Sequence, residues 1–456
     1  MNFTKNHDFK FLSRISIYQG LFLVVILLSL SCSSIKRLQK SKVKEYQNLV
    51  QHSAIFNQGF TGFELYDPSS DQVIYSINAD KYFTPASNTK IFTFYTSLNI
   101  LGDSIPAFRY VAKGDSLLFW GTGDPSFNNP YLVQNERVIQ FFKNRSEQLF
   151  FCSYNFQDVR FGSGWAWDDY YYSYQPEKSS FPFHGNVVQF EKKKGIDVFE
   201  IKPAYFKDKL VTNQQQIPYR IKRQPDGNTF EFNPGSMNRY EYENDHPFKY
   251  SDELLVAMLS DVLEKNVELL TSESMPPANS KVIYSVSADT LYRRLMQESD
   301  NFIAEQLLLL CANDVFDTLN TSKIIQYAKD SLLSDLPDQA NWVDGSGLSR
   351  YNLFTPRSIV FLLNQLYKKI PRERLFHIFP AGGESGTIST RYAGDGKPYV
   401  FAKTGTLRNN HCLSGYLVTR SVKVLIFSFM HNNFPKGSAA HKDEMEKVLK
   451  AIYLAY

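Results

Sequence analysis

The sequence has few cysteines and no marked excess of charge of either sign. Among its 456 residues are four Cys, and 50 Lys and Arg are balanced by 46 Asp and Glu, which leaves a formal net charge of +4. So mild and mixed a charge gives no support for a nucleic-acid partner, which usually requires a strongly basic surface. The sequence also contains no Cys-x-x-Cys pair and no Cys/His spacing typical of zinc, so we expect no metal site.

Long apolar runs are also scarce, and the one near the N-terminus is short. Residues 21–30, LFLVVILLSL, follow basic side chains at Lys5, Lys10 and Arg14. A run of this length is too short to cross a hydrocarbon core, which needs about 20 residues. A basic segment followed by a short apolar run is typical of an export signal, and we assign residues 1–31 to a signal peptide. The rest of the chain is then expected outside the cytoplasm, in the periplasm of the cell envelope.

The signal ends at a cysteine, Cys32, which follows a small residue, Ser31. This arrangement resembles the lipobox of bacterial lipoproteins, although Leu30 lies one position nearer to the cysteine than the usual Leu. We expect Cys32 to be lipidated and to anchor the chain to a membrane; ordinary signal cleavage nearby and an uncleaved anchor are the alternatives. Residues 32–45 include the basic stretch KRLQKSKVK and are interpreted as a tether beside the membrane surface.

The three remaining cysteines are Cys152, Cys311 and Cys412. An odd number at such wide spacing does not form a disulfide framework. We expect buried thiols, and a Cys311–Cys412 bridge in an oxidising compartment is left open.

The composition is that of a globular protein, with 43% hydrophobic and 21% charged residues, and the length allows two or three domains. Residues 46–112 and 288–456 read as two parts of one catalytic domain, an α/β (α+β) unit, because the chemistry lies in them. Residues 113–287 between them are rich in Tyr, Phe, Asn and Gly and alternate as strands do, which predicts an inserted β-rich region. The elements expected in the two flanking parts are strands at 62–66, 72–77, 399–404, 412–419 and 422–431, and helices at about 87–101, 301–312 and 441–454.

The first element that carries chemistry is Ser87-Asn88-Thr89-Lys90. On a helix, Ser87 and Lys90 lie one turn apart on the same face. A serine hydroxyl needs an adjacent base to act as a nucleophile, and lysine serves only if burial, a nearby cation such as Lys403 or the helix N-terminus lowers its pKa. The same spacing recurs at residues 33–36 and 41–44, so the alternative is a helix-capping serine beside a solvated lysine.

Two further elements complete the set. Ser299-Asp300-Asn301 lies at a predicted joint between two helices, where it presents a hydroxyl and an amide; the alternative is a simple helix N-cap. Lys403-Thr404-Gly405-Thr406 lies on a predicted strand, which places alternate side chains on opposite faces. Gly405 is expected to let a substrate backbone approach closely, the alternative being a strand that ends in a turn.

Together the three elements resemble the Ser-x-x-Lys, Ser-x-Asn and Lys-Thr-Gly set of penicillin-binding proteins and serine β-lactamases. Residues 343–352 (VDGSGLSRYN) with the following Thr-Pro, 121–125 (GTGDP) and 164–169 (GWAWDD) are similar to signatures of the class C low-molecular-mass D-alanyl-D-alanine carboxypeptidase/endopeptidase family. The resemblance covers residues 46–456 and departs from the family's Gly-x-Asp-Gly-Thr pattern at residues 382–387, which read GGESGT. It implies a transpeptidase-like domain, with an antiparallel sheet flanked by helices and a β-rich insert.

The resemblance also implies roles for the residues. Ser87 would attack the penultimate D-Ala carbonyl, with Lys90 as base, and Ser299 would pass a proton to the leaving amine. Asn301 would hold the substrate amide. The backbone N–H groups of Ser87 and Thr406 would hold the oxyanion. The terminal carboxylate would be bound by Lys403, Thr404 and Thr406. No cofactor is implied.

These features predict a serine-type D-Ala-D-Ala carboxypeptidase/endopeptidase whose partners are peptidoglycan peptides and, as covalent inhibitors, β-lactams. Two alternatives remain open. One is a β-lactamase, esterase or D-amino-acid peptidase on the same fold; the other is a non-catalytic envelope scaffold. A fluorescent penicillin, with Ser87→Ala as control, discriminates among them.

Overall fold

The computed structural model describes residues 43–133, 136–196, 198–215, 220–234, 241–271 and 274–456. The signal peptide, Cys32 and most of the expected tether therefore lie outside the described residues. The first described helix spans residues 43–51, so the last three residues assigned to the tether belong to a helix. In these described ranges, no helix is both long enough and apolar enough to cross a membrane.

An antiparallel five-stranded sheet forms the centre of the catalytic region, in the order β14-β15-β16-β1-β2. Every residue of β16 is buried. Because helices cover both faces, the inner strands β1, β15 and β16 are buried along nearly their whole length rather than at alternate residues. The strands are β1 (Phe60–Asp67), β2 (Gln72–Ile77), β14 (Val400–Leu407), β15 (Asn410–Val418) and β16 (Val424–Asn432).

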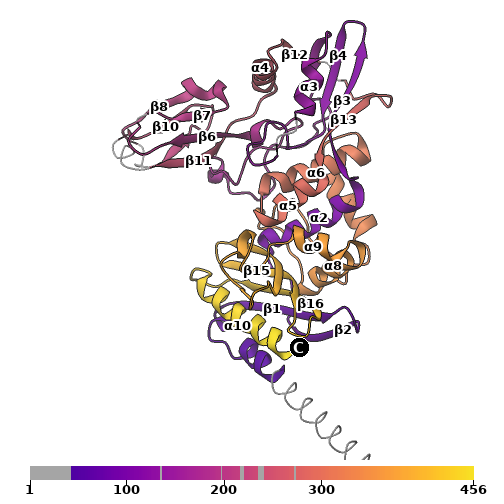
Figure 1. Ribbon diagram of the computed structural model, residues 1–456, viewed down its shortest axis with the longest axis vertical. Coiled ribbons are helices and arrows are strands. Elements are labelled where there is room, and N and C mark those ends of the chain that lie inside the picture. Colours follow the sequence, from indigo (N-terminus) through magenta and orange to yellow (C-terminus); the bar gives the residue numbers. More distant parts are fainter. Residues whose placement is uncertain (1–42, 134–135, 197, 216–219, 235–240, 272–273) are drawn as a thin grey trace, which may run out of the picture.

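Two hydrophobic cores lie on opposite faces of this sheet. One is shared with α10 (Ala439–Ala455) and the helix over 43–51, and the other with a larger group of helices; Figure 1 shows α10 below the sheet and the larger group above it. The larger group comprises α2 (Thr89–Ile100), α5 (Ala288–Gln297), α6 (Asn301–Phe316), α7 (Thr321–Tyr327), α8 (Pro356–Lys369) and α9 (Arg372–Ile378). Helix α6 is buried along most of its length, which explains why its apolar residues show no single face.

The region between the two catalytic parts contains a second five-stranded sheet, in the order β12-β5-β4-β3-β13. Strand β3 starts at Ser104, so residues 104–112, which the sequence placed in the catalytic part, pair with strands of the insert. Phenylalanines fill its core, among them Phe108, Phe119 and Phe142, which accounts for part of the high aromatic content. The elements are β3 (Ser104–Lys113), β4 (Ser116–Gly121), β5 (Gln148–Phe151), β12 (Val267–Leu269), β13 (Lys281–Ser287), α3 (Arg137–Lys143) and α4 (Asp252–Leu263).

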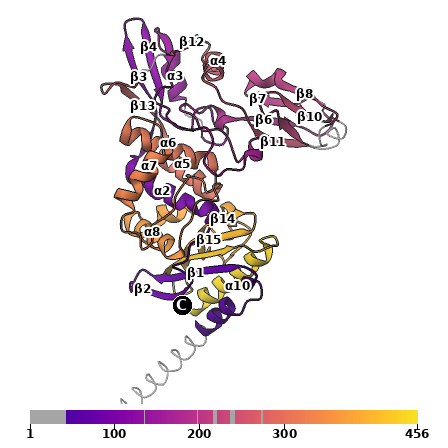
Figure 2. The same cartoon turned by 180° about the vertical axis from the view of Figure 1, so that it is seen from behind.

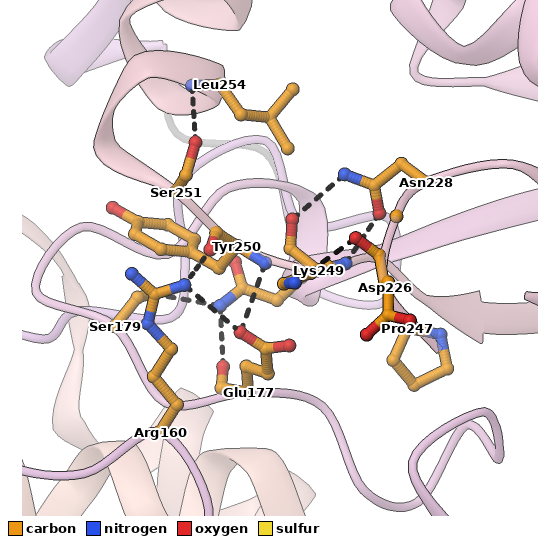
Figure 3. Close-up of polar contacts among 12 residues, drawn as sticks. Arg160, Glu177, Ser179, Asp226, Asn228, Pro247, Lys249, Tyr250, Ser251 and Leu254 are labelled. Carbon is orange, nitrogen blue, oxygen red and sulfur yellow. Dashed lines mark hydrogen bonds and ion pairs between the residues drawn. The ribbon is translucent and has the colours of Figure 1, made fainter. Parts of the chain in front are cut away.

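Two small sheets, β11-β6-β7 and β8-β10-β9, project from the side of this region (Figure 2). Polar contacts hold their connection to the rest of the insert, as Figure 3 shows. The carboxylate of Glu177 accepts a 3.1 Å hydrogen bond from the backbone N–H of Tyr250, and Arg160 donates to the Tyr250 carbonyl and pairs with Glu177. The strands are β6 (Val187–Lys192), β7 (Glu200–Lys202), β8 (Leu210–Thr212), β9 (Ile221–Arg223), β10 (Phe230–Phe232) and β11 (Tyr242–Pro247).

The cysteines of the described residues are all buried. Cys311 and Cys412 form no disulfide, so the expectation of buried thiols is confirmed and the bridge left open by the sequence is absent from the described part of the chain. Burial raises the pKa of each of these two thiols to about 12, which makes them unreactive as nucleophiles.

Candidate active site

Ser87 lies in a tight 3-10 turn, η2 (Ala86–Asn88), that leads directly into α2. Its neighbour Ala86 has a φ of 48°, a left-handed conformation that side chains with a Cβ rarely adopt and that is common at functional sites. Gly347 packs on this turn, and a Cβ there would lie 2.0 Å from the Ala86 carbonyl oxygen. The turn therefore projects Ser87 from the start of the helix and is held in place by close backbone packing.

Lys90 lies beneath Ser87 and is fully buried, with 0% of its surface exposed. Its Nζ donates to Ser87 Oγ at 3.0 Å, to Asn301 Oδ1 at 2.6 Å and to the Ser346 carbonyl oxygen at 2.6 Å. Burial lowers the pKa of Lys90 to about 8, and three carboxylates oppose this shift. Of the three causes that the sequence left open, the structure bears out burial, and Lys403 is not among the groups that shift this pKa. A neutral amine is thus accessible near neutral pH, within reach of the hydroxyl.

Ser299 and Asn301 lie at the joint between α5 and α6. Ser299 has a φ of 58°, and Asp300 caps α6 by accepting a 3.0 Å bond from the Ile303 N–H. Asp300 is therefore the N-cap of this helix, as the alternative interpretation of the sequence allowed. Ser299 and Asn301 are not needed as caps, and they contact Lys403 and Lys90. Asn301 accepts from Lys90 and donates through Nδ2 to the Tyr174 carbonyl oxygen at 2.9 Å.

Lys403, on β14, is also fully buried, and this strand packs against the turn η2. Its Nζ donates to Ser299 Oγ and to the Thr404 carbonyl oxygen, both at 2.8 Å, and neither acceptor is charged. Burial lowers the pKa of Lys403 well below its usual value, and the charge of Lys90 lowers it further. The two amines therefore favour a state in which they are not both protonated.

Gly405 has a packing role that the sequence did not predict. A Cβ at this position would lie 2.5 Å from the Pro85 carbonyl oxygen and 3.0 Å from the Ser87 nitrogen. The glycine is therefore required because β14 packs directly against the nucleophile turn, and a close approach of the substrate backbone stays a prediction. Asn88 strengthens this contact by donating to the Lys403 carbonyl oxygen at 2.9 Å.

Thr404 and Thr406 lie at the free edge of β14, which is the outermost strand of the sheet. Thr404 Oγ1 donates to Thr387 Oγ1 at 2.8 Å, so the segment that departs from the family pattern lies beside the Lys-Thr-Gly strand. Thr406 is exposed, and its Oγ1 lies 2.8 Å from His411 Nδ1.

A cavity of about 1240 Å³ joins these residues. Ser87, Ser299, Asn301 and Thr406 line it, so the three sequence elements converge on one cleft. Its other walls come from the insert (Trp165, Asp168, Asp169, Tyr174), from the loop over 347–351 and from residues 434–438. The insert therefore forms part of the cleft as well as a separate module.

Sequence reasoning missed the group that orients Lys90. Asp344 accepts from the Gly347 N–H at 2.9 Å, the Ser349 N–H at 2.7 Å and Trp165 Nε1 at 2.8 Å. This carboxylate shapes the loop that delivers the Ser346 carbonyl oxygen to Lys90. The signal was the stretch VDGSGLSRYN, whose similarity to a family signature assigns no physical role to its aspartate.

Glu305, on α6, is a second residue that was missed. Its Oε1 accepts from the Ser346 N–H at 2.7 Å, so it supports the same loop from below. Burial, together with the charge of Asp344, raises the pKa of Glu305 to about 7. No local pattern marks it, because it lies within an otherwise apolar helix.

Comparison with known proteins agrees with this geometry. The model of the D-Ala-D-Ala carboxypeptidase 3 (S13) family matches residues 46–452. D-alanyl-D-alanine carboxypeptidase DacB of Haemophilus influenzae is 24% identical over 419 residues, covering 84% of this chain and 87% of that protein. Penicillin-sensitive carboxypeptidase A of Dictyostelium discoideum is 22% identical, covering 85% of each chain.

Among solved structures, penicillin binding protein 4 (dacB) from Haemophilus influenzae is similar, with a TM-score of 0.72 at 20% identity. The alignment covers 90% of this chain and 99% of that one. The predicted fold, an antiparallel sheet flanked by helices with a β-rich insert, is confirmed. Because the family match extends over most of the sequence, the chain belongs to the D-Ala-D-Ala carboxypeptidase 3 (S13) family and is a serine-type D-Ala-D-Ala carboxypeptidase acting on peptidoglycan.

Proposed function

We propose that Ser87 is the nucleophile of this carboxypeptidase and that Lys90 is its base. The observation that carries the proposal is the 3.0 Å contact between Lys90 Nζ and Ser87 Oγ, combined with a pKa near 8 for that amine. Ser87 Oγ attacks the carbonyl carbon of the penultimate D-Ala, and its proton passes to Lys90. The C–N bond to the terminal D-Ala then breaks, leaving an ester on Ser87 that water hydrolyses.

The other residues act on the charges that develop during this sequence. The leaving amine takes a proton through Ser299, which Lys403 contacts at 2.8 Å. The backbone N–H groups of Ser87 and Thr406 stabilise the oxyanion. Asn301 holds the substrate amide. The terminal carboxylate lies against Thr404 and Thr406, in the positive field of Lys403.

Endopeptidase activity at the same serine is a second proposed function. A cavity of about 1240 Å³ exceeds the 300–1,000 Å³ typical of small-molecule sites, and a cross-linked peptide needs more room than a single terminal D-Ala. Release of monomers from a purified cross-linked dimer, compared with D-Ala release from a pentapeptide, measures the ratio of the two activities.

Export to the cell envelope follows from the substrate, and we propose that a lipid on Cys32 provides the membrane anchor. The support is the sequence alone, because Cys32 lies outside the described residues. Metabolic labelling with a fatty acid tests the proposal: Cys32→Ser is expected to lose both the label and the membrane-bound fraction. Retention of the protein in the membrane fraction without label would favour an uncleaved signal instead.

Ser87→Ala is expected to abolish labelling by a fluorescent penicillin and D-Ala release from a pentapeptide. A matched control is Ser76→Ala, because Ser76 is an exposed serine on β2 that also begins a Ser-x-Asn sequence. Labelling that persists in Ser87→Ala would contradict the assignment of the nucleophile. A label that the wild type releases within seconds would favour a β-lactamase over a carboxypeptidase.

A further inference from the structure

Three buried histidines lie behind the cleft, on the α10 side of the sheet. His411 on β15 and His431 on β16 are directly opposite each other, and His441 comes from the first turns of α10. Their exposed fractions are 1%, 1% and 3%. His411 is the cross-strand partner of Thr406, a polar residue that lines the cleft. His441 stacks on the ring of Phe434, another lining residue, but forms no hydrogen bond with it.

The contact between the two side chains is specific. Thr406 Oγ1 lies 2.8 Å from His411 Nδ1, while His431 makes the equivalent contact one strand further in, with Thr61 Oγ1 at 2.9 Å. Burial lowers the pKa of His411 to about 3, so this imidazole is neutral at working pH. A neutral imidazole has one nitrogen that donates and one that accepts, so the Thr406–His411 bond depends on the tautomer.

The chemistry of the substrate selects between the two tautomers. A terminal carboxylate can only accept hydrogen bonds, and the Thr406 hydroxyl has a single hydrogen to give. If that hydrogen pointed to His411, the hydroxyl would present only lone pairs to the carboxylate. Thr406 can therefore donate to the substrate and keep its hydrogen bond to His411 only if His411 is the donor in that bond.

We propose that His411 is a positioning residue whose Nδ1–H donates to Thr406 Oγ1 and so directs the Thr406 hydroxyl hydrogen into the cleft, toward the terminal carboxylate of the substrate. The inference rests on the proposed role of Thr406. It assigns a part in substrate recognition to a side chain that is itself buried behind the strand.

The tautomer can be measured directly on the intact protein. With ¹⁵N-labelled histidine, the His411 Nδ1 resonance is expected to be of the protonated type and Nε2 of the unprotonated type. The reverse assignment would overturn the proposal, whatever the activity of the enzyme.

Kinetics provide the second test, with a peptide ending in D-Ala-D-Ala and the same peptide as its C-terminal amide. His411→Leu is expected to raise KM for the free carboxylate about tenfold, the effect of losing one hydrogen bond to a charged group, with kcat nearly unchanged. The preference for carboxylate over amide then falls by the same factor. His411→Asn is expected to restore it, because the Asn Nδ2 donor occupies the place of His Nδ1.

His431→Leu is the matched control, since His431 is equally buried on the same face but contacts Thr61 rather than a cleft residue. It is expected to leave the carboxylate preference unchanged. An equal loss of preference in His431→Leu, or none in His411→Leu, would overturn the proposal. Ser87-dependent penicillin labelling is followed in every variant, so that a failure of the catalytic assignment is recognised separately.

Discussion

The surroundings of Lys90 and of Lys403 differ, although both side chains are fully buried. Around Lys90, the carboxylates of Asp344, Glu305 and Asp300 oppose the effect of burial, and the pKa stays at about 8. Around Lys403, the only charge that acts in the described part of the chain is that of Lys90, which adds to the effect of burial, and the pKa is lowered well below its usual value. Burial alone therefore does not determine what a lysine does in this cleft.

The difference indicates how one site separates two tasks. Lys90 is close to the pKa that suits a general base at neutral pH. Among the residues that the structure describes, none forms an ion pair with Lys403, so a negative group brought by the substrate is what favours its ammonium form. The carboxylate of the bound peptide therefore favours protonation of Lys403. The protonated Lys403 in turn favours the neutral, basic form of Lys90.

The largest expected effect is that of Lys90→Met. Removing the base is expected to slow acylation about 10³-fold, equally for substrates with a free carboxylate and with an amide. The melting temperature is expected to fall modestly, because Asn301 Oδ1 and the Ser346 carbonyl oxygen lose their donor, and it is measured alongside the rate. Stopped-flow labelling with a fluorescent penicillin measures the rate; a loss smaller than tenfold would contradict the role of Lys90.

Lys403→Met is expected to have the next largest effect, and a selective one. Loss of a buried charge that binds an anion reduces kcat/KM for the free-carboxylate peptide about 10²-fold, and for the amide much less. Steady-state kinetics with both peptides measures the selectivity. If Lys403→Met and Lys90→Met changed the ratio of kcat/KM for the two peptides in the same way, the proposed division of tasks between the lysines would be wrong.

The pH dependence of acylation gives the smallest and sharpest test. Only the neutral amine of Lys90 can accept a proton, so the rate should rise with pH and level off above about 8. Glu305 raises the pKa of Lys90, and Glu305→Gln should therefore move this rise to lower pH. The control is Glu64→Gln: Glu64 is another buried carboxyl with a pKa raised to about 7, which does not act on Lys90. If the acylation rate of Glu305→Gln rose at the same pH as that of the wild type, the pH dependence would belong to a group other than Lys90.

Much of the site could be predicted from local sequence. Ser87 and Lys90 are separated by one helical turn, and the single Lys-Thr-Gly stretch is flanked by apolar strands, so a helix start and a strand follow from spacing and pattern. That this strand lies at the edge of the sheet follows only from the strand pairing. What could not be predicted depends on contacts between distant segments. Gly405 is required because residues 85–87 pack closely against it. Asp344 is required because it holds a loop that Trp165 of the insert also contacts.

The boundary of the insert was also beyond the sequence. Residues 104–113 alternate as a half-buried strand does. Alternation predicts which side chains of a strand are buried, but it does not predict the sheet to which the strand belongs. Only the pairing of β3 with β13 and β4 assigns it to the insert. His411 was missed for a similar reason: its partner Thr406 lies across a hairpin, and nothing in the local sequence distinguishes a cleft-facing pair from one in the core.

The pairing of β3 with β13 has a consequence for how such a chain can be rebuilt. The insert leaves and re-enters the catalytic part at neighbouring positions, because Ser104 pairs with Ser287 and the Ala288 N–H donates to the Asp103 carbonyl oxygen at 2.9 Å. Two strand ends held side by side can be closed by a short turn. The two ends of the insert are therefore held beside each other whatever the length of the chain between them, so a difference in insert length need not move the ends of the catalytic part.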